Sequence, residues 1–419
     1  MKLTRSLFAF ALVCSSSLLF AEDVFRFRGE NSQGKYNEPG LLDSWPEGGL
    51  TPKWINSDLG EGWSSVIKVK DRLYLNCLDP DDSTKESVVC LDLDGKKLWQ
   101  QTVGGVWKPS YSFPRATPTY VVGEGDGDDK LLVLSGGGEL YCLAAADGKK
   151  LWNHDVFKDH QASISMWGVA ENVVVQDGKV FVTLAGKDAL AVAYHIADGS
   201  VAWKTAPEDD RISYATPILY ENILITLATR YVWGIDTENG QVLWKGDFLE
   251  DSGGRLPRSG NGCTPFVIRG NRFFVTHGYG QGSVMYEILP DGKGIEKRWA
   301  SKAMDGHHHG AVELDGRIYG SDHGGGFCCL NWNTGETISK ESWGNTGAAN
   351  TIYADGKLFL YDERRGMLGL AEPGDPLKII SSFPVEFGSQ QHWPHQVISD
   401  GVLYVRRGNA LAAFDIRKK

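Results

Sequence analysis

A polar turn followed by a short alternating run of apolar and polar positions recurs at regular intervals along the chain. In one copy, Asp177 and Gly178 form the corner ahead of Val180 and Phe181. Such a run predicts a short strand, and an Asp-Gly or Asn-type corner supplies the positive φ that a tight hairpin needs. Eight copies are found, at residues 70–74, 129–133, 177–181, 221–225, 269–273, 315–319, 355–359 and 400–404.

A glycine turn followed by a tryptophan accompanies most copies of this element. The spacing is four residues in the first four units, and it is looser from Gly292 to Trp299 and from Gly335 to Trp343. Two hairpins then give four short strands per unit. We expect each tryptophan to lie on the outer strand of its unit and to dock against the next unit. The regular pairs are Gly95 and Trp99, Gly148 and Trp152, Gly199 and Trp203, and Gly240 and Trp244.

The period of the repeat predicts an eight-bladed β-propeller. Asp71 and Asp400 lie 329 residues apart, so the seven intervals average about 47 residues. Four strands in a period of about 40–50 residues are the sequence signature of propeller blades. Stacking around an axis buries both faces of each sheet against its neighbours. We therefore predict an all-β fold over residues 50–419, a single eight-bladed β-propeller with four-stranded antiparallel blades.

The eighth unit lacks its own fourth strand. It runs through residues 411–415, and the sequence stops at Lys419. Near the other end, residues 52–56 read as a strand without a partner and contain Trp54. We predict that this N-terminal strand completes the eighth blade and closes the ring, which removes two open sheet edges.

The first 21 residues have the pattern of a secretory signal peptide. A basic start and the apolar residues 7–13 precede an expected cleavage after Ala21. Lipidation at Cys14 is disfavoured, because large residues precede this cysteine and the apolar stretch is short. Residues 22–49 then form an extended lead. We expect a periplasmic or secreted protein.

Composition and charge narrow the class further. The 419 residues include 51 Gly, 14 Trp and 15 Tyr, which suits strands joined by tight turns. The net charge of −10, without any Lys/Arg-rich run, argues against nucleic-acid binding, since such a surface repels phosphates. No later apolar run approaches the roughly 20 residues of a membrane span. We expect a monomer without a transmembrane segment.

The tryptophan repeat resembles that of a known propeller family. Asp236, Thr237, Gly240 and Trp244 form a motif similar to the tryptophan-docking repeat of quinoprotein dehydrogenases, which use pyrroloquinoline quinone (PQQ). The motif also resembles the repeat of the outer-membrane-barrel assembly lipoprotein, which binds no cofactor. Residues 27–46 resemble the start of exported repeat proteins common in planctomycete-like bacteria. The resemblance implies a PQQ-like eight-bladed propeller but no particular activity, because the matching positions are structural.

The functional residues of the dehydrogenases cannot be placed in this sequence. Those enzymes are longer and use a Glu/Asn/Asp set for calcium and base, and they carry a vicinal cysteine pair over the quinone. Cys328 and Cys329 are adjacent, but Cys329 precedes Gly335 by six residues, just as Cys142 precedes Gly148. This register predicts that Cys329 is an ordinary third-strand residue and that the two cysteines pack in the interior.

Histidines and aromatic residues gather where the innermost strands should begin. The starts of these strands line the axial funnel, in which propellers bind ligands. Small residues and proline dominate there, as a narrow channel requires, but five of the ten histidines also fall at this level. We predict a ligand or metal funnel formed by His307, His308, His309, His392, His395, Arg115, Arg258, Trp167 and Trp393, flanked by Tyr214 and Asp305.

The three consecutive histidines raise the question of a metal. On an extended strand, His307 and His309 would share one face and His308 would point to the other. A His-x-His pair is half of a zinc or copper site, which His395 could complete. The alternative is that these are solvated funnel residues that hydrogen-bond to backbone carbonyls.

The sequence is therefore compatible with two functions from different classes. The first is an exported, non-catalytic scaffold that binds a protein, a glycan or a small ligand at the funnel or the loops, with no cofactor. The second is a PQQ- or metal-dependent periplasmic oxidoreductase, similar to the alcohol dehydrogenases, that uses the funnel. The sequence assigns no catalytic residue to either.

Overall fold

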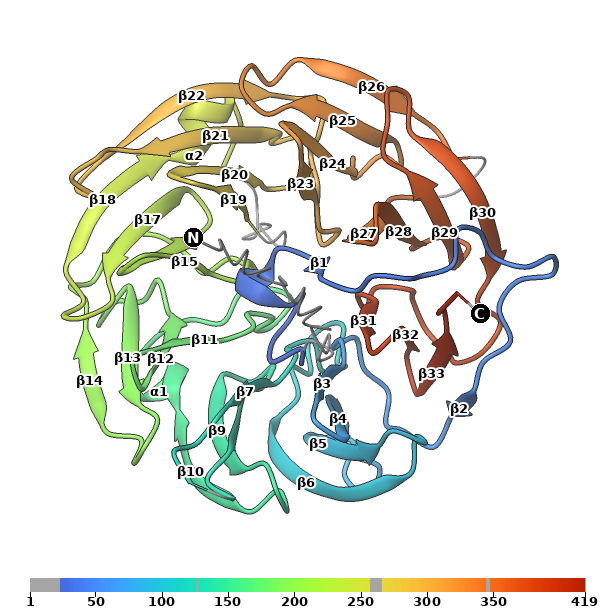
Figure 1. The fold of residues 1–419 in the computed structure, drawn as a ribbon. Coiled ribbons are helices and arrows are strands. Elements are labelled where there is room, and N and C mark those ends of the chain that lie inside the picture. The colour runs from blue at the N-terminus through green and yellow to red at the C-terminus, as the bar shows by residue number, and fades with distance from the viewer. Residues whose placement is uncertain (1–22, 126, 257–265, 344–346, 419) are drawn as a thin grey trace, which may run out of the picture.

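Eight antiparallel blades of four strands each are arranged around a central axis in the computed structural model, which describes residues 23–125, 127–256, 266–343 and 347–418 (Figure 1). The predicted all-β propeller with eight four-stranded blades is therefore confirmed. Most innermost strands are only three residues long, since they crowd around a narrow axis, whereas the second to fourth strands have up to nine residues.

The blades follow one another in chain order, and the last one combines three C-terminal strands with one strand from near the N-terminus. Blades 1 to 4 contain β3 (Ile67–Val69), β4 (Arg72–Leu78), β5 (Lys85–Asp92), β6 (Lys97–Gly105); β7 (Thr119–Val121), β8 (Lys130–Leu134), β9 (Glu139–Ala144), β10 (Lys150–Asp155); β11 (Val174–Gln176), β12 (Lys179–Thr183), β13 (Ala191–His195), β14 (Val201–Lys204); and β15 (Ile218–Tyr220), β16 (Ile223–Leu227), β17 (Tyr231–Asp236), β18 (Val242–Asp247). Blades 5 to 8 contain β19 (Val267–Arg269), β20 (Arg272–Thr276), β21 (Ser283–Ile288), β22 (Ile295–Ser301); β23 (Val312–Leu314), β24 (Arg317–Ser321), β25 (Phe327–Asn331), β26 (Thr337–Glu341); β27 (Ala349–Ala354), β28 (Lys357–Asp362), β29 (Met367–Glu372), β30 (Lys378–Pro384); and β31 (Val397–Ser399), β32 (Val402–Arg407), β33 (Ala410–Asp415), β2 (Trp54–Asn56).

The two α-helices of the described residues are short and lie in connections between blades. The helices α1 (Val156–Asp159) and α2 (Phe248–Ser252) follow the outer strands of blades 2 and 4, and each begins at an aspartate that accepts a hydrogen bond from a backbone N–H of the first turn. Within the described residues, no helix is both long and apolar enough to cross a membrane.

The outer-strand tryptophans join neighbouring blades, as predicted. The Trp99 ring of blade 1 lies against Gly148 in the last turn of blade 2, where an added Cβ would come within 2.6 Å of the ring. Gly148 also has a φ of 76°, so both its backbone and its missing side chain are required for this contact. The same arrangement joins Trp152 to Gly199, Trp203 to Gly240 and Trp299 to Gly335.

The ring is closed by the N-terminal strand, which confirms that prediction. Strand β2 pairs antiparallel with β33, with Trp54 opposite Ala413. The ring of Trp54 then lies against Gly95 of blade 1, and its Nε1 donates to the carbonyl of Leu93 at 2.8 Å. The tryptophan contact therefore continues across the junction between the eighth and first blades.

The lead is not a loose extension, because it crosses the end of the axial channel (Figure 1). It contains the 3-10 helix η1 (Glu30–Ser32) and the strand β1 (Lys35–Tyr36), which adds to β27 in parallel. Along its path it pairs with the inner edges of several blades. These contacts are Val24 with Lys68, Phe25 with Tyr120, Asn31 with Leu219 and Gln33 with Ile268.

The vicinal cysteines are packing residues of a third strand, as their register predicted. Cys328 and Cys329 lie in β25 and are buried. Cys328 belongs to the core between blades 5 and 6, and Cys329 to the core between blades 6 and 7. Because adjacent strand residues point to opposite faces, the two thiols are directed into different cores.

Candidate functional site

One mouth of the axial channel holds a cavity of about 240 Å³. Two kinds of segment build it: the residues ahead of innermost strands, and the turns between second and third strands. Phe27 of the lead also lines it. Its lining comprises Phe27, Trp63, Tyr111, Arg115, Trp167, Ala170, Asn172, Tyr214, Thr216, Tyr279, His307, His308, His323, Glu363, Trp393 and His395.

Two aromatic walls line this cavity. In the first, the ring centroids of Trp63 and Trp393 are 4.9 Å apart, and those of Tyr111 and Trp393 are 5.5 Å apart. In the second, the centroids of Trp167 and Tyr279 are 5.9 Å apart in a stacked arrangement. Aromatic pairs of this kind present rigid apolar surface with polar edges, which suits the binding of a ligand.

The tyrosines at the rim are held in an uncommon backbone conformation. Tyr111 has a φ of 46° and Tyr279 a φ of 55°, in the left-handed region that bulky residues seldom adopt. Both side chains remain exposed, at 48% and 42% of their full surface. Strained backbone and exposed aromatic surface at one place are typical of a binding site.

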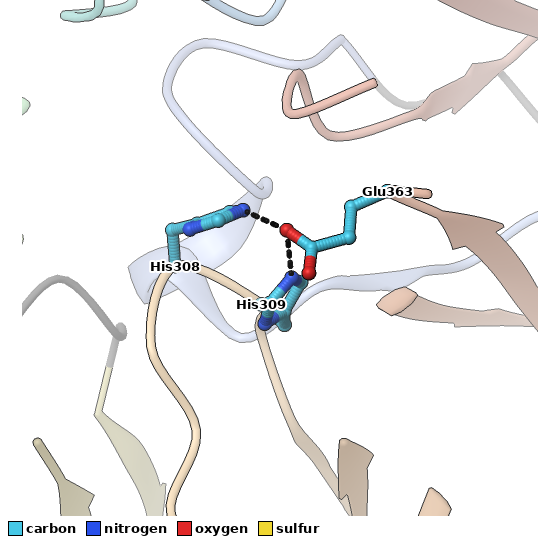
Figure 2. A group of neighbouring side chains, drawn as sticks. All are labelled: His308, His309 and Glu363. Carbon is cyan, nitrogen blue, oxygen red and sulfur yellow. Dashed lines mark ion pairs between the residues drawn. The ribbon is translucent and has the colours of Figure 1, made fainter. Parts of the chain in front are cut away.

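A carboxylate and two imidazoles meet at the cavity wall (Figure 2). The Nε2 atoms of His308 and His309 each lie 3.3 Å from Oε2 of Glu363. Burial and the neighbouring histidine lower the pKa of His308 to about 4. Burial alone would raise the pKa of Glu363, but its contacts with the two imidazoles outweigh this and lower it. At neutral pH the group therefore contains an ionised Glu363 carboxylate and a neutral His308 ring.

A chain of hydrogen bonds fixes the histidines around this group. Nδ1 of His308 lies 3.0 Å from Nδ1 of His307. Because a guanidinium only donates, Nδ1 of His395 accepts from Arg28 at 3.0 Å, and Nε2 of His395 then donates to the carbonyl of His308 at 2.9 Å. Both ring nitrogens of His395 are thus occupied, which leaves no lone pair for the metal-binding role predicted for it.

The structure places most of the predicted funnel residues at the cavity. Arg115, Trp167, Trp393 and the predicted histidines other than His309 and His392 line it. His309 lies behind the wall, where it contacts Glu363. His392 is a packing residue, with Nδ1 2.7 Å from the hydroxyl of Tyr361. Arg258 lies outside the described residues.

The predicted alternation of His307, His308 and His309 is wrong. Residues 305–311 form bends and irregular backbone, and β23 begins only at Val312. The period of two that governs side chains on a strand therefore does not apply here. As a result, His308 and His309 converge on the same carboxylate.

Sequence reasoning missed several cavity residues, for two different reasons. Tyr279, His323 and Glu363 lie in the turns between the second and third strands of blades 5, 6 and 7. In a four-stranded antiparallel blade these turns open at the same mouth as the starts of the innermost strands, so the repeat register could have identified them. Phe27 carries no such signal, since nothing in its sequence places the lead across the channel.

The residues present do not fit the calcium–quinone site that the dehydrogenase resemblance implies. Calcium takes six to eight oxygen ligands, whereas Glu363 is the sole carboxylate among the described residues that line the cavity. Four of the other lining residues are histidines, and the vicinal cysteines lie in the cores between blades. The site is therefore imidazole-rich and aromatic.

Fold and site together define a PQQ-like propeller with an aromatic, histidine-rich cavity at one end of its axis. Residues 84–377 match the family model described as outer membrane protein assembly factor BamB, and the chain belongs to this family. No curated protein sequence matches the chain significantly.

Solved structures agree with this fold. BamB from Moraxella catarrhalis is 13% identical, with a TM-score of 0.62 over 88% of this chain and 98% of that one. Quinohemoprotein alcohol dehydrogenase from Comamonas testosteroni is 11% identical, with a TM-score of 0.60 over 95% and 81%. The C-terminal WD40 domain of Sif2 is 7% identical, with a TM-score of 0.54 over 88% and 99%. At these identities the likeness concerns the fold alone.

Proposed function

We propose that this protein is an exported, non-catalytic propeller that binds an extended segment of a partner protein at its aromatic mouth. The observation that carries the proposal is the two aromatic walls of the cavity, with exposed Tyr111 and Tyr279. Membership of a family named for outer membrane protein assembly supports a protein partner. The signal-like residues 1–21 support export to the periplasm or beyond.

The chemistry of the mouth suits aromatic side chains on an extended chain. The cavity of about 240 Å³ accommodates one or two side chains at a time. Nε1 of Trp63, which lines the cavity, has no hydrogen-bond partner among the described residues. Strands of outer-membrane barrels present such side chains, with aromatic residues near their ends and apolar residues at alternate positions.

Fluorescence anisotropy with dye-labelled, barrel-strand peptides tests the proposal. We expect saturable binding by the wild-type chain, and a loss of about tenfold or more in affinity for Trp393→Ala and Trp63→Ala, because central aromatic anchors dominate such interfaces. Val122→Ala is the matched control, since Val122 is apolar and 61% exposed but follows the far end of an innermost strand. Equal affinities for all variants, or no binding by the wild type, would reject a protein-binding mouth.

The alternative, a quinone- or metal-dependent oxidoreductase, is favoured by one observation, the imidazole–carboxylate group of His308, His309 and Glu363. Dye-linked dehydrogenase assays on protein reconstituted with PQQ and calcium, or with a transition metal, distinguish the two functions. Alcohol-dependent dye reduction that Glu363→Gln abolishes would replace the scaffold by an enzyme. Saturable binding of an oligosaccharide in place of peptides would assign the mouth to a glycan.

A further inference from the structure

The imidazole–carboxylate group contains a buried side chain that the protein itself leaves unsatisfied. The side chain of His309 is fully buried. Neither Nδ1 nor Nε2 of this ring has a hydrogen-bond partner within the described part of the chain. A neutral imidazole has one donor and one acceptor, and burying both without partners is costly. An arrangement of this kind indicates that a ligand completes the site.

The distances within the group match those between ligands of one metal ion. With metal–nitrogen and metal–oxygen bonds of about 2.0–2.2 Å, neighbouring ligand atoms of a tetrahedral or octahedral site lie about 3–3.4 Å apart. Each of the two Nε2 atoms lies 3.3 Å from Oε2 of Glu363. The three ligand atoms all lie within 4.8 Å of one another. The two distances to Oε2 are therefore already those between ligands of a shared ion.

Direct hydrogen bonds explain the same contacts less well. If both rings donated to Glu363, each N–H would point at the carboxylate. However, the Nε2 atoms of His308 and His309 do not meet hydrogen-bond geometry despite their short distances to Oε2. The ring N–H directions miss the oxygen. An ion placed between the three atoms would instead meet the lone pairs of both rings and the charge of the carboxylate.

The surroundings of His308 are compatible with the tautomer that binds a metal. Its Nδ1 lies 3.0 Å from Nδ1 of His307, so one of these two nitrogens carries the shared proton. A proton on Nδ1 of His308 leaves the lone pair of its Nε2 free to bind an ion. Metal-ligating histidines generally donate their other ring N–H in this way, which orients the ring. The bond from His395 to the carbonyl of His308 further holds this backbone segment.

We propose that His308 Nε2, His309 Nε2 and Glu363 Oε2 bind a divalent transition-metal ion whose remaining coordination positions open into the aromatic cavity. Two imidazoles and one carboxylate are a ligand set for zinc or iron rather than for calcium or magnesium. His308 and Glu363 both line the cavity, so the open positions face the mouth. A bound partner with a carboxylate or carbonyl group would complete the coordination.

Metal titration of the untagged mature chain tests this site, with Zn²⁺ and Co²⁺ as the probes. Calorimetry should show one equivalent of Zn²⁺, and Co²⁺ should give visible d–d absorption bands in the wild type. Glu363→Gln keeps the shape of the side chain but removes the charge, and should weaken binding by about 100-fold or more. His154→Ala is the matched control, because His154 also faces a carboxylate, Asp159 at 3.9 Å, outside any group of three ligands.

His309→Asn gives a second reading of the same site. Because His309 is fully buried, its replacement can destabilise the fold. The melting temperatures of His309→Asn and Glu363→Gln are therefore first compared without metal. Zn²⁺ should raise the melting temperature of the wild type and of His154→Ala but of neither site variant. No binding of either metal by the wild type, or equal binding by Glu363→Gln, would overturn the proposal. The fluorescence-anisotropy assay with peptides is independent of this test, because it measures binding to the aromatic walls without added metal.

Discussion

Arg28 is a charged side chain enclosed at the centre of the propeller. No carboxylate pairs with it among the described residues; instead it donates to the carbonyls of Ser32, Thr351 and Ala311 and to the ring of His395. Burial lowers its pKa to about 10, and burial together with this guanidinium keeps the pKa of His395 well below its ordinary value. A cation so deeply buried is tolerated because its N–H groups find acceptors on several elements. One side chain thereby ties the lead to blades 6, 7 and 8.

Glu171, ahead of β11, is a buried acid whose protonation should make stability depend on pH. Burial raises its pKa from 4.5 to about 8. The backbone N–H of Thr183, which donates to Oε1 at 3.0 Å, lowers the pKa but by less than burial raises it. The folded chain therefore holds this proton up to about pH 8, whereas the unfolded chain releases it near 4.5. The contribution of Glu171 to the free energy of unfolding is therefore largest below about pH 4.5 and is lost as the pH rises towards 8.

Glu171→Gln should remove this pH dependence, since the amide still accepts from Thr183 and does not ionise. Urea unfolding at pH 5, 6.5 and 8 should show the wild type losing up to about 1.4 kcal/mol per pH unit relative to the variant. Glu238→Gln, at an exposed turn, serves as the control. Parallel pH curves for Glu171→Gln and the wild type would contradict the assignment.

At the scale of elements, the contact between an outer-strand tryptophan and the next glycine turn is the repeated joint of the ring. Trp203 places its ring against Gly240 and donates from Nε1 to the carbonyl of Thr237 at 3.0 Å. Trp244 departs from the rule: it packs over Gly234 of its own blade and stacks on Phe273, with ring centroids 5.9 Å apart. The looser spacing in the fifth unit, where the next turn glycine is Gly292, accompanies this departure.

Substitution at these two tryptophans should separate burial from hydrogen bonding. Replacing either ring by alanine should cost about 3–5 kcal/mol, because both are buried. Trp203→Phe should cost about 1 kcal/mol more than Trp244→Phe, since Nε1 of Trp244 lacks a partner in the described structure. Denaturant unfolding of the four variants measures both differences. Equal costs for the two phenylalanine variants would show that the bond to Thr237 contributes nothing.

At the scale of the molecule, the ends of the chain complete the ring. Strand β2 covers the outer edge of β33, and the lead covers the inner edges of several blades before it reaches β2 (Figure 1). Uncovered edges are templates for pairing with other chains. The same lead supplies Phe27 to the cavity, so closure of the ring and formation of the site depend on one segment.

Deletion of residues 22–58 from the mature chain should therefore cause aggregation. The shortened chain loses β2 and the lead, which exposes β33 and the inner edges together. Light scattering coupled to size-exclusion chromatography compares it with the chain from residue 22 onward. A shortened protein that stays monomeric with an unchanged melting temperature would refute the closure argument.

The fold could be read from the sequence because its determinants are local and repeated. The Asp177–Gly178 corner, the Gly148–Trp152 spacing and the stray strand around Trp54 each follow from turn chemistry and a fixed period. Few folds other than a propeller allow blades of about 47 residues to bury both of their faces. The register also located the packing cysteines and the mouth at which the histidines gather.

The composition of the site was decided only by the tertiary structure. Glu363 reaches His308 and His309 because a bend at residues 305–311 replaces the expected strand, and because blade packing brings the turn after β28 to the same mouth. Arg28 and His395 meet across 367 residues of chain, which no local pattern encodes. Local periodicity specifies each blade. The contacts across the axis depend instead on the positions that the blades take relative to one another in the closed ring, and on the path of the lead.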